Sequence, residues 1–269
     1  MRRVATFAAG ALAAGGSYGV HRVLARRQRS PRWQRTNSAG NPVTLLEGPA
    51  YVAGAVLGAA TGGPAGVVAA LGAGAFGALD DFAGDAASKG LKGHLGAAAQ
   101  GRVTTGLVKI VGIGASGLLA ASLADRQRDD VRALDTLVGG AVVAGTANLA
   151  NLLDLRPGRA LKVTVLASLP LLLAGGAGSA PPAAAATGAA LGVLAPDLAG
   201  TTMLGDTGAN AAGALVGVAL LGATGRRGRL AALALLAGLT LASEKVSFTR
   251  VIESTPVLRE LDAWGRPAR

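Results

Sequence analysis

The sequence predicts an all-α polytopic membrane protein with about nine (eight to ten) transmembrane helices. Of its 269 residues, 51% are hydrophobic and the mean hydropathy is +0.45, which is too apolar for an ordinary soluble domain. Forty-two residues are glycine, and only 3% are aromatic. Small residues suit membrane helices, because such helices associate through close approach of their backbones.

Nine apolar segments predict the helices in chain order. The first follows Arg2-Arg3 and imitates a signal peptide, but cleavage would leave an arginine-rich start at 22–35 that resists export, so we expect a retained helix. The second and third are separated only by Gly62-Gly63-Pro64, a tight-turn signal. Several segments are shorter than the ~20 residues that a full span prefers. The segments lie near 4–21, 46–61, 64–79, 105–123, 134–152, 160–177, 181–199, 209–224 and 229–245.

The charges predict the orientation of these helices. The formal net charge is +11, and most basic residues lie between the apolar segments. That placement is typical of topology signals and anionic-lipid contacts, and it argues against nucleic acid as a partner. The positive-inside rule puts the N-terminus outside and the loops 22–45, 80–104 and 153–162 in the cytoplasm. The segment Arg226-Arg227-Gly228-Arg229 violates this rule.

The same reasoning divides the chain into two parts. Residues 1–245 are expected to form a single polytopic membrane domain in the bacterial cytoplasmic membrane, and residues 246–269 a charged C-terminal cytoplasmic tail. The chain has no cysteine, which excludes disulfides and cysteine-ligated zinc. Its two histidines, His21 and His94, are too few for a histidine-based metal site.

Three small polar clusters stand at the ends of apolar segments. An even number of expected helices separates them, so all three are predicted to lie on one side of the membrane in either orientation. Their carboxylate and amide oxygens are hard ligands, which favour magnesium over zinc. The clusters are Asp80-Asp81 with Asp85, then Asn148, Asn151 and Asp154, then Gly205-Asp206-Thr207-Gly208.

Each cluster has a chemical interpretation. Adjacent carboxylates at Asp80 and Asp81 repel each other, and a divalent cation or a shared proton relieves that repulsion. The spacing from Asn148 to Asp154 places three polar side chains on one helical face. The glycines around Asp206 allow a phosphate to approach the start of the following helix, where the helix dipole favours an anion.

Each cluster also has a plainer interpretation. A pair such as Asp80-Asp81 at a helix end is usually just a solvated terminus. Gly205-Asp206-Thr207-Gly208 is typical of a turn in which Asp or Thr caps a helix. Asn148 and Asn151 could join membrane helices by hydrogen bonds. The functional interpretation therefore depends on the three clusters occurring together.

The order and text of these motifs resemble the polyprenyl-phosphate N-acetylhexosamine-1-phosphate transferases. That family includes the phospho-N-acetylmuramoyl-pentapeptide transferase of peptidoglycan synthesis. The resemblance covers roughly residues 30–220. The matching pieces are Leu79-Asp80-Asp81-Phe82, Lys89-Gly90-Leu91, the segments 148–154 and 203–209, and Asn37-Ser38-Ala39-Gly40-Asn41-Pro42-Val43.

The resemblance implies a polytopic fold with cytoplasmic active-site loops and a magnesium-dependent reaction. In that reaction a polyprenyl (undecaprenyl) phosphate attacks a UDP-N-acetylhexosamine and releases UMP, for cell-wall biogenesis. Asp80 and Asp81 would serve the lipid phosphate, with Asp80 a candidate base, and Asp206 and Asp154 would hold Mg²⁺. The implied catalytic residues are Asp80, Asp81 and Asp206. The implied substrate-binding residues are Lys89, Asn148, Asn151 and Asp154.

The chain also departs from the family pattern. After Asp154 the family continues with Gly and a second Asp-Gly pair, whereas this chain reads Leu155-Arg156-Pro157-Gly158-Arg159. The late His-rich motif that helps to bind the sugar nucleotide is absent, and the charged tail either replaces it or docks on the helices. An alternative is therefore a catalytically inactive relative that binds polyprenyl phosphate or an envelope-assembly partner. A transporter is disfavoured because the acids lie at helix ends. Self-association into a homodimer is left open.

Overall fold

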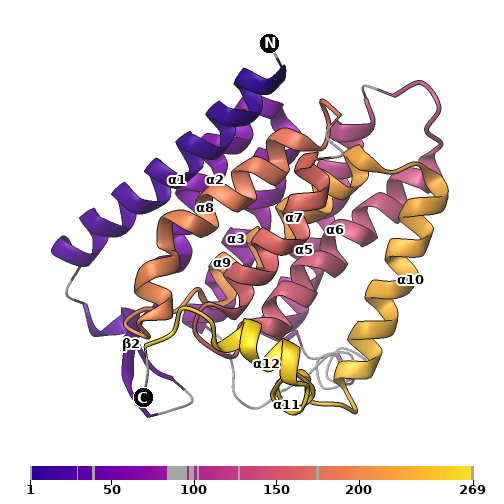
Figure 1. Ribbon diagram of the computed structural model, residues 1–269. Helices are drawn as coiled ribbons and strands as arrows, with labels where there is room; N and C mark the ends of the chain where they lie inside the picture. Colours follow the sequence, from indigo (N-terminus) through magenta and orange to yellow (C-terminus); the bar gives the residue numbers. More distant parts are fainter. Residues whose placement is uncertain are drawn as a thin grey trace.

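The computed structural model is a bundle of helices with a small β-hairpin and two short helices at one end (Figure 1). It describes residues 2–28, 30–37, 40–83, 96, 100–101, 103–126, 128–173 and 176–267. The long helices are α1 (Arg2–Arg27), α2 (Glu47–Ala59), α3 (Pro64–Ala83), α5 (Thr105–Asp125), α6 (Ala133–Leu153), α7 (Arg159–Leu173), α8 (Ala180–Leu198), α9 (Gly205–Ala223) and α10 (Arg226–Ser243). The short elements are η1 (Pro31–Trp33), β1 (Gln34–Thr36), β2 (Pro42–Thr44), η2 (Ala60–Gly62), α11 (Phe248–Ser254) and α12 (Pro256–Ala263).

The predicted all-α character is confirmed, since every one of the nine apolar segments coincides with a helix. Within the described residues, three helices are long and apolar enough to cross a membrane: α3, α5 and α6. A fourth span is possible by the same measure if α10 and α11 are taken together, although α11 is bent by 92° from α10. The protein thus has the composition of a membrane protein.

Large apolar side chains on the outer surface of the bundle support the same conclusion. Phe7 on α1, Val111 on α5 and Leu235 on α10 are all more than half exposed. In water, such side chains would add an unfavourable apolar surface to several helices at once. In a bilayer, the same side chains would face lipid.

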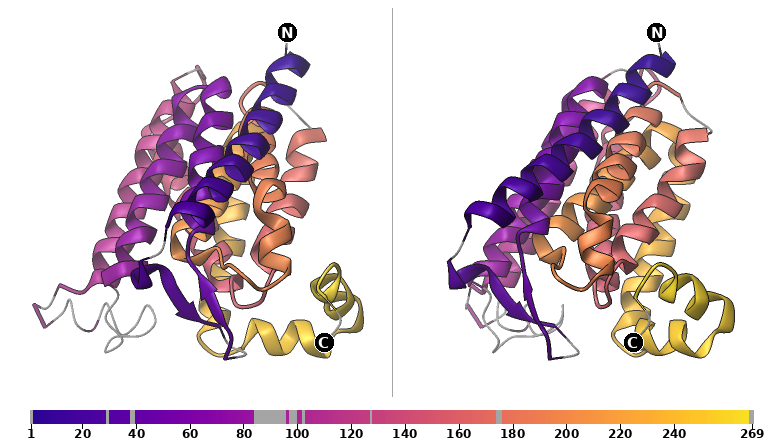
Figure 2. Two further views of the ribbon diagram at one scale, coloured as in Figure 1. Left: turned by 90° about the vertical axis from the view of Figure 1, so that its left-hand side faces the viewer. Right: turned by 60° about the vertical axis from the view of Figure 1, so that its left-hand side comes forward.

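Small residues allow the helices to approach closely, as the composition predicts. Helix α1 packs against both α2 and α8, and all three run side by side in Figures 1 and 2. A methyl group on Gly54 of α2 would collide with the backbone and Ser17 of α1, and one on Gly188 of α8 would collide with the backbone of Gly10. Backbone proximity, rather than bulky aromatic packing, therefore holds this side of the bundle together.

A β-hairpin covers one end of the bundle. Strands β1 and β2 pair antiparallel, with Arg35 opposite Val43. The hairpin is joined to the connection between α8 and α9, because the amide of Met203 donates to the carbonyl of Thr44 over 2.9 Å. The ring of Trp33 meets the ring of Phe82 edge-on, with centroids 4.7 Å apart, so the end of α3 is held against the hairpin.

The C-terminal segment folds back on the same end of the bundle. Helices α11 and α12, drawn in yellow in Figure 2, lie across this end. Arg159 at the start of α7 forms a bidentate ion pair with Asp262, with Nε–Oδ1 and Nη2–Oδ2 distances of 2.8 and 3.0 Å. The side chain of Arg159 is only 2% exposed. Of the two arrangements expected for the charged tail, the structure thus has it docked on the helices.

Candidate functional site

Four predicted aspartates come together at the end of the bundle that carries the hairpin. Asp80 and Asp81 lie in the last turn of α3, Asp154 caps the C-terminal end of α6, and Asp206 lies in the first turn of α9. They come from polar clusters far apart in the sequence. The structure therefore places parts of all three clusters at one end of the helices, as their spacing predicts.

Asp81 fixes the start of α9. Its Oδ1 accepts a hydrogen bond from the amide of Asp206 over 3.0 Å. Its Oδ2 accepts from the amide and the hydroxyl of Thr207 over 2.9 and 2.5 Å. These amides are among the four that a helix start leaves without an intrahelical partner. Asp81 thus caps α9 from another helix, and it fixes the backbone of Asp206 and Thr207.

The backbone around this cap requires small residues. Gly205 has a φ of +63°, a left-handed conformation that side chains rarely adopt. A methyl group on Gly77 of α3 would collide with the backbone of Asp206. Glycine at both positions allows α3 and the start of α9 to touch, which brings Asp80 and Asp81 to Asp206.

Lys109 on α5 bridges two of the aspartates. Its Nζ donates to Asp80 Oδ2 over 3.0 Å and also to Asp206 Oδ2. The Lys109 side chain is 15% exposed, and each of the two aspartates is 25% exposed. One ammonium group thus balances two carboxylates, while Asp81 and Asp154 add further negative charge nearby. The site has an excess of negative charge that a cation would relieve.

The sequence patterns do not predict Lys109 as a site residue, because its two partners lie in other helices. A signal was present, however, since it is the only charged residue between Thr105 and Ser122 in an otherwise apolar helix. A lone charge in such a helix is expected to face a partner inside the protein.

Asp154 lies at the inner edge of the site, beyond the last residue of α6. Removal from water, followed by the charges of Asp197 and Asp206, raises the pKa of its carboxyl well above the usual range. A hydrogen bond from the amide of Gly205 partly opposes this effect. Burial and the neighbouring acids therefore favour the protonated form of Asp154 unless a cation binds beside it.

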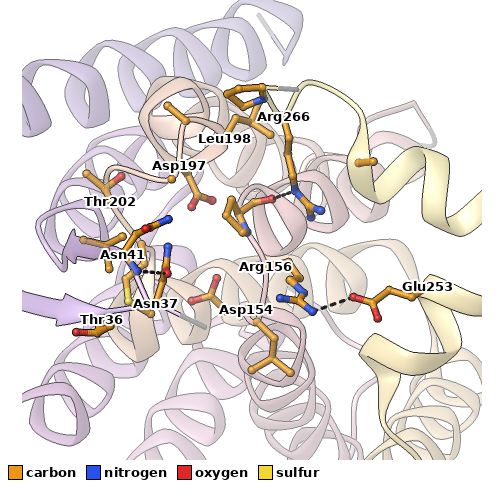
Figure 3. A pocket seen from close by; sticks show the side chains of 18 residues that line it. Thr36, Asn37, Asn41, Asp154, Arg156, Asp197, Leu198, Thr202, Glu253 and Arg266 are labelled. Atoms are coloured by element: carbon orange, nitrogen blue, oxygen red, sulfur yellow. Dashed lines mark hydrogen bonds and ion pairs between the residues drawn. The ribbon is translucent and has the colours of Figure 1, made fainter. Parts of the chain in front are cut away.

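A cavity of about 780 Å³ opens beside Asp154. Its volume is within the range of about 300–1,000 Å³ that is typical of sites for small molecules. Figure 3 shows that polar side chains from the hairpin, from the loops after α6 and α8, and from the C-terminal segment surround it. The polar and charged residues that line it are Thr36, Asn37, Asn41, Asp154, Arg156, Asp197, Thr202, Glu253 and Arg266.

The C-terminal segment forms one wall of this cavity. Arg266 donates from Nε to the carbonyl of Pro157 over 2.8 Å, and its Nη2 lies 2.9 Å from Asp262. Glu253 of α11 pairs with Arg156 over 2.9 Å. Both arginines thus bring positive charge to a cavity that Asp154 also lines. The sequence predicted a charged tail but not its place beside the polar cluster.

Two buried acids near the cavity were also missed. Asp197, on α8, is 3% exposed, and its Oδ2 accepts from the amide of Gly158 over 2.9 Å. Glu47, at the start of α2, is fully buried and accepts from the Thr202 hydroxyl over 2.5 Å. Asp197 lies within an expected membrane span, so its position alone marked it as costly to bury.

The remaining predicted residues are placed less centrally. The Asn148 side chain donates to the Thr240 hydroxyl of α10 over 3.2 Å, which is the interhelical bond that the plainer interpretation expects. The Asn151 carbonyl accepts from the amide of Asp154 over 3.1 Å. Among the described residues that were predicted for the site, only Asp154 lines the cavity. Lys89 and Asp85 lie outside the described residues.

The donor set can be compared with what Mg²⁺ requires. Within the described ranges, no three acidic or histidine side chains are grouped closely enough to hold a metal by themselves. Mg²⁺, however, is usually bound by one or two carboxylates together with substrate phosphates and water. Asp206 and Asp154 fit that pattern, with the second half of the coordination shell left to a substrate. The described residues do not form a site in which protein side chains alone would surround the ion.

Comparison with known proteins adds no assignment. No protein-family model matches the chain, and no curated protein sequence matches it. The site therefore has to be interpreted from its own geometry: aspartates at one end of an apolar helical bundle, a bridging lysine, and an adjoining polar cavity.

Proposed function

We propose that this protein is an integral membrane transferase. It moves a phospho-N-acetylhexosamine from a UDP-sugar to a polyprenyl phosphate such as undecaprenyl phosphate, and UMP is released. The reaction requires Mg²⁺ and supplies a lipid-linked sugar for cell-envelope glycan synthesis. The proposal rests on the motif resemblance and on the arrangement of the aspartates.

The observation that carries the proposal is the cluster of Asp80, Lys109 and Asp206 beside the cavity at Asp154. Phosphoryl transfer needs little covalent help from a protein, because it depends on positioning and on neutralising charge. A lysine between two carboxylates, next to a cavity large enough for a sugar nucleotide, supplies groups for both tasks. The apolar helices around the cluster give a lipid substrate access from the bilayer.

Each residue then has a role in the proposed reaction. Asp80 accepts the proton of the lipid phosphate, and Asp81 holds the start of α9 so that Asp206 faces the site. Asp206 and Asp154 are the residues that would hold Mg²⁺, which neutralises the diphosphate when bound. Lys109, which pairs with Asp80 and Asp206, would supply positive charge to substrate phosphate oxygens bound beside them.

The cavity wall from the C-terminal segment is assigned to the UDP-sugar. Arg156 and Arg266 line the cavity and suit the nucleotide diphosphate, because guanidinium groups pair with phosphate oxygens. Asn37, Asn41 and Thr202 offer amide and hydroxyl groups for sugar hydroxyls. In this proposal the tail replaces the His-rich loop that the chain lacks.

The finer topology belongs to the same proposal: nine spans, the N-terminus outside, and the site in the cytoplasm. The opposite end of the bundle carries the arginines that violate the positive-inside rule. Two of them are paired there, Arg229 with Asp125 and Arg226 with Asp135. Their charge is partly neutralised, which weakens the violation.

Single cysteines test this orientation, because the natural chain has none. Val257→Cys lies on α12, where Val257 is 67% exposed, and Arg227→Cys lies at the other end of the bundle. In intact cells, a membrane-impermeant maleimide should label Arg227→Cys and leave Val257→Cys unlabelled. The reverse pattern would overturn the orientation but leave the chemistry untouched.

The activity is tested with the purified full-length protein. It is mixed with undecaprenyl phosphate, Mg²⁺ and a panel of UDP-N-acetylhexosamines, and UMP release is measured. The proposal expects UMP only when lipid, sugar nucleotide and Mg²⁺ are all present. Lipid binding without turnover on any sugar would instead support the second candidate, a catalytically inactive relative.

One specific observation favours that second candidate. Lys109 pairs with both Asp206 and Asp80, and Asp81 is engaged as the cap of α9. A protein that only binds a lipid phosphate could keep this arrangement without turnover. The two candidates are separated by UMP release, since both predict binding of polyprenyl phosphate.

A further inference from the structure

A second charged site lies at the other end of the bundle, away from the aspartates. It is formed where α5 is followed by α6 and where α9 is followed by α10. The aspartate site lies at the opposite ends of these same helices, and a 21-residue helix is about 30 Å long. The two sites are thus separate, and this one has no part in the proposed transfer reaction.

Arg229 is the buried arginine of this second site. Its side chain is 2% exposed, and its Nη2 and Nη1 atoms donate to the two oxygens of Asp125 over 2.6 and 3.0 Å. Nη1 also donates to the carbonyl of Asp135 over 3.2 Å. The Nε atom is buried and has no hydrogen-bond partner within the described part of the chain. A buried donor without a partner costs free energy and needs an explanation.

Arg229 lies in the wall of a pocket of about 190 Å³, which we call the arginine pocket. The pocket is too small for a whole sugar nucleotide, since sites for such molecules are typically about 300 Å³ or more. Its volume suits a compact polar group. The residues that line it are Arg128, Asp130, Val131, Arg132, Asp135, Arg226 and Arg229.

The arginines of the pocket keep hydrogen-bonding capacity to spare. Arg226 pairs with Asp135 through Nε, over 3.3 Å, and its side chain is 48% exposed. Arg132 is exposed and forms no ion pair with any described residue. Arg128 uses Nη1 for the carbonyls of Leu221 and Thr224. A guanidinium group has five donors in a fixed fork, so each of the three still has donors for a ligand.

The balance of charge selects an anion. Four arginines line the pocket together with two aspartates, and Asp125, which pairs with Arg229, is a third acid beside them. Asp130 is 78% exposed, so its pairing with Arg128 at 3.6 Å is weak. The excess is positive, and the planar forks of arginine match the tetrahedral oxygens of phosphate. The neighbouring Leu134 and Leu230 are 55% and 46% exposed, which places an apolar surface beside the pocket.

We propose that the arginine pocket binds a phosphate group at the membrane surface opposite the aspartate site. The source is either the headgroup of an anionic lipid, whose chains would lie on the exposed leucines, or free inorganic phosphate. The bound phosphate pairs with Arg132 and Arg226 and brings an acceptor to the Nε of Arg229. It also joins the two connections that precede α6 and α10, so it stabilises this end of the bundle.

The test uses the purified full-length protein in two arms. In the first arm, the protein in nanodiscs of phosphatidylcholine, with or without phosphatidylglycerol, is analysed by native mass spectrometry for retained lipid. In the second arm, inorganic phosphate is titrated into detergent-solubilised protein by calorimetry. The site variant is the double substitution Arg132→Gln with Arg226→Gln. The control is Arg227→Gln, which removes a neighbouring exposed charge that does not line the pocket.

We expect the double variant to bind at least about tenfold more weakly than the control, because two charge-assisted contacts are lost. Retention of phosphatidylglycerol alone identifies a lipid headgroup, and a calorimetric signal with phosphate alone identifies the free ion; either outcome supports the pocket. Equal binding by the double variant and the Arg227→Gln control would overturn the proposal. Failure of the wild type to bind in both arms would do the same.

Discussion

Both ends of the helical bundle carry acidic and basic side chains, but acidic ones are in excess at one end and basic ones at the other. At the aspartate end, one lysine balances Asp80 and Asp206, and these groups remain 15–25% exposed beside a large cavity. At the arginine end, Arg229 and Asp125 are 2% and 6% exposed and pair in a bidentate arrangement. A buried, closely matched pair anchors helices, whereas half-buried and unbalanced charges are available to a ligand.

The comparison predicts different costs when one charge is removed from each end. Breaking a buried pair leaves the partner charge without compensation. Breaking an exposed pair leaves water as a substitute. Four predictions follow from this difference, beginning with the largest effect on stability.

Asp125→Asn should destabilise the protein by about 3–5 kcal/mol, because it leaves the charge of Arg229 buried without an equal partner. The free energy of unfolding, measured in detergent with a chemical denaturant, checks this value. The matched control is Asp130→Asn, since Asp130 is 78% exposed and its arginine is 3.6 Å away. We expect that control to change stability by less than about 0.5 kcal/mol. Equal effects of both variants would show that burial of the Arg229–Asp125 pair does not decide its contribution to stability.

Asp81→Ala should cost about 1–2 kcal/mol, which is the usual range for loss of a helix cap. It should also lower turnover, since Asp206 loses its fixed position. Asp80→Ala is the comparison, because Asp80 contacts Lys109 and caps no helix. Thermal unfolding of the two variants should therefore show the larger loss for Asp81→Ala. A larger loss for Asp80→Ala would contradict the assignment of Asp81 as the cap.

Docking of the C-terminal segment should depend on pH. Burial alone would raise the pKa of Asp262, but hydrogen bonding and the charge of Arg159 outweigh it and lower that pKa. The ionised Asp262 therefore stabilises the docked segment fully above about pH 4, the ordinary pKa of aspartate in an unfolded chain. This stabilisation is lost as the pH falls through the lower pKa that Asp262 has in the folded protein.

Limited proteolysis after residue 245 measures this docking. An acid-active protease such as pepsin should cut the segment faster as the pH falls below 4, after correction for the protease's own pH profile on an unfolded substrate. Asp262→Asn should expose the segment already at neutral pH. If Asp262→Asn left the segment as protected as it is in the wild type at pH 7, the ion pair with Arg159 would not be what holds it.

The smallest effect is expected at Asn148. Because its side chain bonds to Thr240 and does not line the cavity, Asn148→Ala should cost roughly 0.6 kcal/mol and leave turnover within about twofold. Thermal unfolding and UMP release measure the two quantities. A large loss of turnover at unchanged stability would restore Asn148 to the substrate-binding role that the motif resemblance implies.

The positions of the helices could be predicted from the sequence because apolar length and turn residues are local signals. The shared location of Asp80, Asp154 and Asp206 could also be predicted, since it depends only on how many helices separate them. The partners of these residues could not be predicted, because the role of Lys109 depends on contacts between α3, α5 and α9.

The C-terminal segment shows the same limit in a different way. Its charges are visible in the sequence, but the pairing of Asp262 with Arg159 joins residues about a hundred positions apart. Asp197 follows Pro196 in an alanine-rich helix, and its hydrogen bond to the amide of Gly158 could not be predicted from the sequence. Spacing rules act within a helix, whereas these contacts form between elements, and single-sequence patterns do not specify them.

UMP release by the purified protein tests the central claim most directly, when wild type is compared with Asp206→Asn and with Arg227→Gln from the opposite end. With Mg²⁺, undecaprenyl phosphate and an accepted UDP-N-acetylhexosamine, we expect Asp206→Asn to lower turnover by about a hundredfold or more, since a carboxylate for the metal is lost. Arg227→Gln should keep wild-type turnover. Full activity of Asp206→Asn would contradict the account of the aspartate site.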